Sequence, residues 1–188
     1  MKKLLLLFLL AFGVAGYAQT DDDNDQSSDY LIKTSGDTLT GKFKYMSSEG
    51  DIKTKITVKV NDTLKVTLKA SEVKYFRDGK DEYITFQPEG EEGHFFLKIW
   101  TLGKYLELYE WQVPLDLTGG SKIEYIPFIR KKGEKDFTEI DPGGWKKQLP
   151  DIIDDYEELA DDVWRGKYKL EQLADVIKQY NEWKEDNK

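Results

Sequence analysis

The stretch IKTKITVKVNDTLKVTLK, residues 52–69, alternates apolar and polar side chains on either side of a short polar loop. A period of two is typical of a strand that is buried on one face. A three-residue loop at 61–63 brings the apolar residues of both arms to one face, whereas a two-residue loop would divide them between two faces. The sequence therefore predicts a hairpin that pairs Val60 with Leu64, Val58 with Val66 and Ile56 with Leu68, and that carries Lys53, Lys55, Lys59, Lys65 and Lys69 on its outer face.

Four further hairpins are predicted around this one. In residues 30–45 a two-residue turn at Gly36-Asp37 would pair Tyr30 with Phe43, Ile32 with Gly41 and Thr34 with Leu39. The other turns are expected at Asp78-Gly79 within 73–86, near Leu102-Gly103 within 95–111, and at 131–135 within 123–140. Successive hairpins without an intervening helical period indicate a mainly β (α+β) protein, with residues 30–140 as an antiparallel meander that forms a barrel or a sandwich.

Residues 141–188 have a different period, close to 3.6, which is typical of amphipathic helices. Pro150 suits the first turn of a helix, and Gly166 is a natural end for it. We expect two helices that form a hairpin packed on the sheet. Their apolar stripes are Ile152, Ile153, Tyr156, Leu159, Ala160 and Val163 for the first, and Leu170, Leu173, Ala174, Ile177, Tyr180 and Trp183 for the second.

The N-terminus has the features of a signal peptide in residues 1–18. Lys2 and Lys3 precede an apolar run, 4–14, that is followed by small residues up to Ala18. The run is shorter than the about 20 residues that a membrane-spanning helix needs, so no membrane span is expected after processing. Residues 19–29 are an acidic, flexible leader. The sequence therefore predicts a protein exported through the inner membrane, periplasmic or secreted, and without disulfides because the chain lacks cysteine.

Charge excludes one class of partner. The chain has a formal charge of −8, which becomes −10 once residues 1–18 with their two lysines are removed. An acidic surface is repelled by phosphates, so nucleic acid is not an expected partner.

Four segments together resemble a family of secreted proteins of unknown function found in Bacteroidetes. They are YLIKTSGDTLTGKF (30–43), EVKYFRDGKDEYITF (72–86), FFLKIWTLGKYLELYE (95–110) and ELADDVWRGKYKLEQLADVIKQYNEW (158–183), the last after a Trp-Lys-Lys helix start at 145–147. The resemblance spans nearly all of the chain after residue 18. It implies the same fold and compartment, and no activity.

Enzymatic chemistry finds little support in the residue types. His94 is the single histidine, and the sequence contains no Gly-x-Ser-x-Gly motif that would present a nucleophilic serine to it. One histidine and no cysteine also leave few ligands for a transition metal. The sequence therefore predicts no catalytic residue, no metal site and no cofactor. A carbohydrate-active hydrolase that uses paired carboxylates is kept as an alternative, with Glu107 and Glu110 as its candidates.

The segment 95–111 has apolar or aromatic residues on both faces, and it supplies the candidate ligand-binding residues. These are Phe96, Trp100, Tyr105, Glu107, Tyr109 and Trp111. Either the C-terminal helices cover this aromatic face, or it is an open platform for a glycan or a peptide. Similarly, the lysines outside the hairpin at 52–69 either bind an acidic polysaccharide or envelope phosphates, or protect exposed strands from pairing.

The sequence thus favours an exported, non-enzymatic binding or scaffolding protein of the cell envelope or extracellular space. Its candidate partners are a glycan or an envelope protein. A third possibility is a subunit of an envelope complex that docks through its C-terminal helices. The oligomeric state is not predicted.

Overall fold

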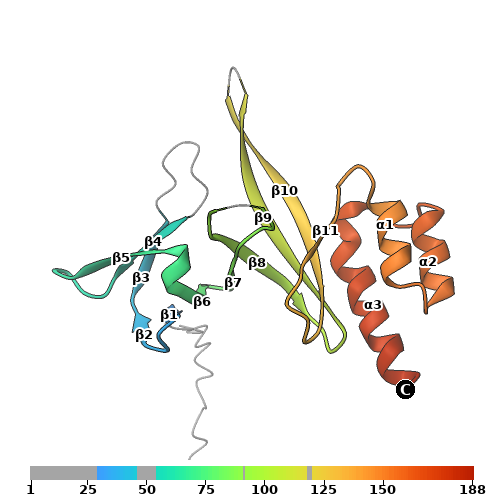
Figure 1. Ribbon diagram of the computed structural model, residues 1–188, viewed down its shortest axis with the longest axis horizontal. Helices are drawn as coiled ribbons and strands as arrows, with labels where there is room; N and C mark the ends of the chain where they lie inside the picture. Colours follow the sequence, from blue (N-terminus) through green and yellow to red (C-terminus); the bar gives the residue numbers. More distant parts are fainter. Residues whose placement is uncertain (1–28, 46–53, 91, 118–119) are drawn as a thin grey trace, which may run out of the picture.

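The computed structural model describes residues 29–45, 54–90, 92–117 and 120–188. The predicted signal peptide, the leader up to residue 28, and Lys53 lie outside these residues. The described chain forms an eight-stranded antiparallel sheet, a three-stranded sheet and a C-terminal helical segment (Figure 1). Along the large sheet the order is β11 (Thr138–Glu139), β10 (Gly120–Lys131), β9 (Leu106–Leu117), β8 (Phe95–Leu102), β7 (Asp81–Phe86), β6 (Val73–Asp78), β1 (Tyr30–Lys33) and β2 (Thr38–Thr40).

The predicted fold class, an antiparallel β meander with helices packed on it, is confirmed. The large sheet ends in two edges, β11 and β2, so it is not closed and the arrangement is consistent with a sandwich. The small sheet has the order β3 (Lys42–Tyr45), β4 (Lys55–Lys59) and β5 (Lys65–Lys69), followed by a 3-10 turn, η1 (Ala70–Glu72). In Figure 1 the small sheet and the helices lie at opposite ends of the molecule, with the large sheet between them.

The register of the hairpin that decides the fold is the predicted one. Ile56 lies opposite Leu68, and Val58 lies opposite Val66. The Val60 amide donates to the Leu64 carbonyl at 3.0 Å, and the Asn61 side chain accepts from the amides of Thr63 and Leu64. The asparagine therefore closes the three-residue loop that puts the apolar residues of both strands on one face.

The predicted register of the first hairpin is wrong. Leu31, and not Ile32, faces the core, and it lies opposite Leu39. The turn spans residues 33–37 instead of two residues, and its ends are joined by the hydrogen bond from the Lys33 amide to the Asp37 carbonyl at 2.8 Å. A shift by an odd number of residues exchanges the two faces of a strand, which is why the prediction put the wrong residues inside.

Phe43 belongs to the other sheet, where it pairs with Val58 on β4. The chain leaves the large sheet at Gly41, whose φ is +155°. A Cβ atom at this position would lie 2.4 Å from the carbonyl oxygen of Lys59. Glycine thus allows β3 to begin directly after β2 and against β4.

The helical segment contains three helices where two were predicted. These are α1 (Trp145–Ile152), α2 (Glu157–Trp164) and α3 (Leu173–Asp186), with the 3-10 turn η2 (Leu170–Gln172) before α3. Pro150 does not begin a helix but lies inside α1. The helix starts earlier because Trp145 and Leu149, one turn apart, are both buried, and because the turn around Asp141 sets its entry. No helix of the described residues is long and apolar enough to cross a membrane.

Three clusters of buried side chains hold the layers together. One face of the large sheet packs against the small sheet around Leu31, Phe76 and Phe96, and against the helices around Leu108 and Ile177. The opposite face carries a third cluster, which consists of Phe86, Leu97, Tyr109 and Phe128 with Phe137 from the chain before β11 packed on it. On the first face the small sheet covers one end and the helices cover the other. The middle of that face, between these two layers, is left available for a cleft.

Candidate functional site

The six candidate binding residues do not form one platform. On β8, Phe96 is buried beneath the small sheet and Trp100 is 43% exposed. On β9, Glu107, Tyr109 and Trp111 alternate with the residues that face the helices, so they belong to the opposite face of the sheet. Tyr105, in the turn between the two strands, packs against the helical cluster. The aromatic face is therefore partly covered and partly open.

Trp100 owes its position to an irregularity in the pairing of β8 with β9. Ile99 lies opposite Tyr109 and Thr101 lies opposite Leu108, so Trp100 is the extra residue of a β-bulge. A bulge turns one side chain out of the regular alternation. Here it places a large indole at the surface, where burial would have been the usual outcome.

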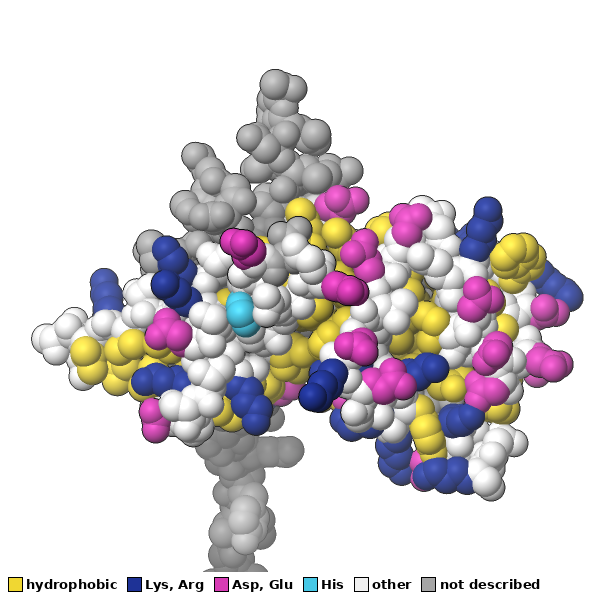
Figure 2. All heavy atoms as spheres, in the orientation of Figure 1, with side chains coloured by type: hydrophobic (Ala, Val, Ile, Leu, Met, Phe, Trp, Pro, Cys, Tyr) yellow, Lys and Arg dark blue, Asp and Glu magenta, His cyan; other side chains and the backbone are white. Residues whose placement is uncertain are grey.

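A cleft of about 370 Å³ opens beside Trp100. Strands β8 to β10 form its floor, and η2 with the start of α3 forms one wall. Its lining residues are Trp100, Leu108, Tyr125, Pro127, Leu170 and Leu173, the glutamates Glu110 and Glu171, and Tyr109, whose ring is buried in the cluster on the opposite face of the sheet. We call it the Trp100 cleft. Figure 2 shows one face of the molecule, where hydrophobic side chains reach the surface between the small sheet and the helices, beside acidic side chains.

The two glutamates of the Trp100 cleft differ in exposure. Glu110 is 8% exposed and accepts a hydrogen bond from the Gln112 side chain at 3.0 Å, whereas Glu171 is exposed at the rim. Trp100 and Tyr125 are both exposed, at 43% and 52%. The cleft therefore presents two aromatic rings and two carboxylates on an otherwise apolar surface.

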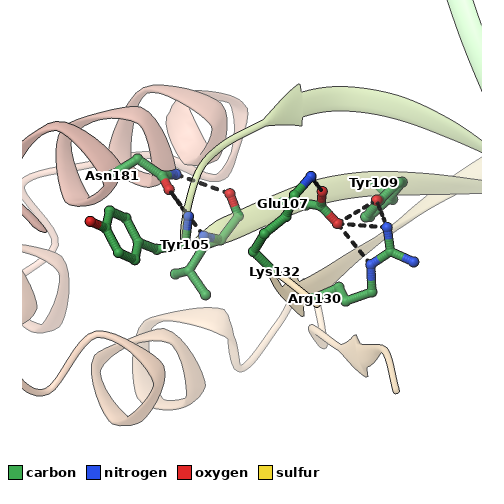
Figure 3. A network of polar contacts seen from close by, with 7 residues as sticks. Tyr105, Glu107, Tyr109, Arg130, Lys132 and Asn181 are labelled. Carbon is green, nitrogen blue, oxygen red and sulfur yellow. Dashed lines mark hydrogen bonds and ion pairs between the residues drawn. The ribbon is translucent and has the colours of Figure 1, made fainter. Parts of the chain in front are cut away.

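Glu107 occupies a separate polar network on the opposite face (Figure 3). Its carboxylate is 1% exposed and accepts from the Tyr109 hydroxyl at 2.8 Å, from Arg130 Nε at 2.8 Å and from Lys132 Nζ at 2.5 Å. The Arg130 guanidinium also hydrogen-bonds to the Tyr109 hydroxyl and lies 4.7 Å from the centre of the Phe137 ring. Two cations and one phenol thus surround a single buried carboxylate.

These neighbours keep Glu107 ionised. Burial by itself would raise the pKa of Glu107, but the hydrogen bonds from Lys132, Tyr109 and Arg130 together lower it below the usual 4.5. Burial and the hydrogen bond to Glu107 raise the pKa of the Tyr109 hydroxyl, which stays protonated. The arrangement fixes β9 to β10 through charged hydrogen bonds and leaves no proton on the carboxylate to transfer.

Asn181 on α3 positions the helical wall of the Trp100 cleft. Its side-chain oxygen accepts from the backbone amides of Tyr105 and Leu106 at 2.8 and 3.0 Å, and its side-chain nitrogen donates to the Leu106 carbonyl at 3.0 Å (Figure 3). The same nitrogen also donates to the Ile177 carbonyl at 2.8 Å. A Cβ atom on Gly103 would lie 2.2 Å from this side chain. The amide therefore joins α3 to the start of β9.

Sequence reasoning found Trp100 but missed the residues that face it from β10 and η2. Tyr125 and Pro127 alternate with Ile126 and Phe128, so this strand is apolar on both faces, and that pattern marks a second covered or functional surface. Glu171 carries no such signal, because a glutamate before a helix is common on any surface. The described residues contain no group of three or more His, Cys, Asp or Glu side chains that could hold a metal ion.

Comparisons with known proteins found no matching family, no matching curated protein and no matching solved structure. The resemblance to secreted Bacteroidetes proteins therefore stays a prediction, and the function is argued from the site.

Proposed function

We propose that this protein is an exported, non-enzymatic binding protein that holds a peptide segment of another envelope or secreted protein in the Trp100 cleft. The observation that carries the proposal is an open cleft with Trp100 and Tyr125 exposed beside Glu110. A concave apolar surface with a few polar groups at its rim is the usual form of a site for a ligand or another protein. The signal peptide predicted for residues 1–18 supports the proposed compartment.

The lining of the Trp100 cleft favours a peptide with a basic residue next to an apolar one. Its volume, about 370 Å³, is at the lower end of the about 300–1,000 Å³ of typical ligand sites, which suits one or two side chains. Leu108, Pro127 and Leu170 offer contacts to an aliphatic side chain. The charge of a lysine or arginine complements the carboxylates of Glu110 and Glu171, and cationic side chains also pack on aromatic rings such as those of Trp100 and Tyr125.

A glycan fits the cleft less well. Sugars carry hydroxyl groups all round their rings, and each buried hydroxyl needs a hydrogen-bond partner. The lining offers two carboxylates among seven apolar or aromatic residues. We therefore treat glycan binding as an alternative result of the binding experiment described below.

The paired-carboxylate hydrolase is disfavoured by the placement of its candidates. Glu107 and Glu110 are three residues apart on β9, so they lie on opposite faces of the strand and cannot flank one glycosidic bond. Glu107 is also held ionised by Lys132 and Arg130, which does not suit a general acid. Docking through the C-terminal helices is disfavoured too, because their apolar stripes are buried against the sheet and one another.

The test is binding of the purified protein to a peptide array in which a central Lys, Arg, Gln or Glu is flanked by Leu or Phe, with a glycan array in parallel. We expect peptides with a central Lys or Arg to bind, and Trp100→Ala and Glu110→Gln each to weaken binding by about tenfold or more. Trp164→Ala is the matched control, because Trp164 is 59% exposed on α2 and does not line the cleft.

Three results would overturn the proposal. Binding of glycans without peptides would assign the cleft to sugars. Equal losses in the Trp100→Ala and Trp164→Ala variants would remove the cleft from the binding site. Turnover of oligosaccharides that is lost in Glu107→Gln would restore the hydrolase.

A further inference from the structure

The outer face of the small sheet carries a regular array of lysines, which we call the lysine face. It consists of Lys42 on β3, Lys55 and Lys59 on β4, and Lys65 and Lys69 on β5, all of them exposed. Three of them form one row across the sheet, because Lys42 lies opposite Lys59 and Lys59 lies opposite Lys65. Lys55 and Lys69 lie opposite each other in a second row.

This array is unfavourable for the isolated protein. Like charges directly opposite each other destabilise a pair of strands. The three strands contain no acidic residue. Lys59 has an ion pair with Asp62 at 2.7 Å in the adjoining loop, an exposed pair of little energetic weight, and no ion pair within the described parts of the chain relieves the other four lysines.

Protection of sheet edges does not explain the array. Lysines protect an exposed edge strand from pairing with another chain. In the small sheet the edges are β3 and β5, and β4 is the central strand with both sides already paired. Lys55 and Lys59 nevertheless extend the array across β4, which has no free edge.

We propose that the lysine face binds an acidic polysaccharide. Neighbouring strands are about 4.8 Å apart and residues along a strand rise about 3.3 Å each, so the first row spans about 10 Å and the two rows are about 13 Å apart. Such a regular grid of positive charges complements negative charges that recur along an extended polymer. Between the rows lie Thr57 and Thr67, whose hydroxyl oxygens are 2.9 Å apart, and hydroxyl groups suit a hydrated sugar chain.

A membrane surface is the less suitable occupant. Proteins that lie on anionic membranes combine basic residues with apolar side chains that enter the lipid. On β4 and β5 the positions between the lysines are Thr57 and Thr67, and the apolar side chains of these two strands point to the core. The lysine face is also at the other end of the molecule from the helices (Figure 1), so this function is independent of the Trp100 cleft.

The experiment measures binding of the full chain to polygalacturonate and to dextran sulfate, with neutral dextran as the reference and phosphatidylglycerol vesicles measured in parallel. A lysine near an anionic surface contributes about fivefold in affinity, so the triple variant Lys55→Gln, Lys59→Gln, Lys65→Gln should bind about 100-fold more weakly at low salt. The control is Lys131→Gln, Lys135→Gln, Lys147→Gln, which changes the net charge equally at exposed sites away from the small sheet. It should bind as the unmodified protein does.

Thermal unfolding of the triple variant gives a second measurement. Removal of the opposed charges should leave the melting temperature unchanged or raise it, so that lost binding is not lost folding. Several outcomes would overturn the proposal. These are absence of polysaccharide binding, equal binding to neutral dextran, equal weakening in the control variant, or binding confined to phosphatidylglycerol vesicles.

Discussion

Replacing Glu107 by glutamine removes the negative charge at the centre of the buried network and leaves the shape of the side chain. The variant keeps one oxygen that can accept a hydrogen bond, but Arg130 and Lys132 lose their ionic partner. Breaking a fully buried ion pair from one side costs about 3–5 kcal/mol. The Arg130 side chain is 24% exposed and that of Lys132 is 54% exposed, so water recovers part of this loss.

We therefore expect Glu107→Gln to lower the free energy of unfolding by about 2–3 kcal/mol at pH 7. For a chain of this size that corresponds to a fall of about 4–12 °C in melting temperature. Glu110→Gln on the same strand is the matched control, because its carboxylate accepts from Gln112 and has no ion pair in the described structure. It should cost about 1 kcal/mol or less.

The pH dependence of the stability loss in Glu107→Gln distinguishes the effect of the missing charge from any effect of side-chain shape. The pKa of Glu107 is lower in the folded protein than its usual 4.5, so its stabilising contribution is present above that value and is lost as the pH falls through the folded-state pKa. Urea unfolding of the unmodified protein and of the Glu107→Gln variant should give free energies of unfolding that differ most at pH 7. The difference should become smaller as the buffer becomes more acidic. A difference below about 0.5 kcal/mol at pH 7, or one that does not change with pH, would refute the role given to this charge.

Four further substitutions test the packing. Trp100→Ala should cost about 1 kcal/mol or less in urea unfolding, whereas Tyr109→Ala should cost about 3–5 kcal/mol, because the first ring is 43% exposed and the second 1% exposed. Equal costs would contradict the exposure of Trp100 and the burial of Tyr109. Gly41→Ala should lower the melting temperature by several degrees, since its Cβ would meet a backbone carbonyl oxygen at 2.4 Å, and an unchanged value would disprove that close approach. Asn181→Ala should lower the free energy of unfolding by about 2–4 kcal/mol. It should also speed hydrogen exchange at the Leu106 amide, because this amide loses its hydrogen-bond acceptor. Unchanged exchange at that amide would show that other contacts hold α3 against β9.

Alternation of side chains predicted the strands and most of their turns without reference to distant residues. The β4–β5 register followed from one condition, that the apolar residues of both arms share a face, and the structure has that register. The same condition failed for β1 and β2, because Tyr30, Leu31 and Ile32 are all apolar enough to face inward. The small sheet, which packs against Leu31, decides which of these three residues faces the core. The local pattern of apolar residues in β1 does not indicate where that sheet will pack.

The Trp100 cleft was beyond the sequence for a related reason. The sequence determined that the protein is a mainly β fold with helices at its C-terminus, because periods of two and 3.6 express local geometry. Only the tertiary structure decided which aromatic residues share a face, since a bulge at Trp100 breaks the alternation and Tyr125 and Leu170 reach the same cleft from distant parts of the chain. The face on which a side chain lies follows from the period of its own strand or helix. A site assembled from five elements depends in addition on how the buried surfaces of those elements fit together.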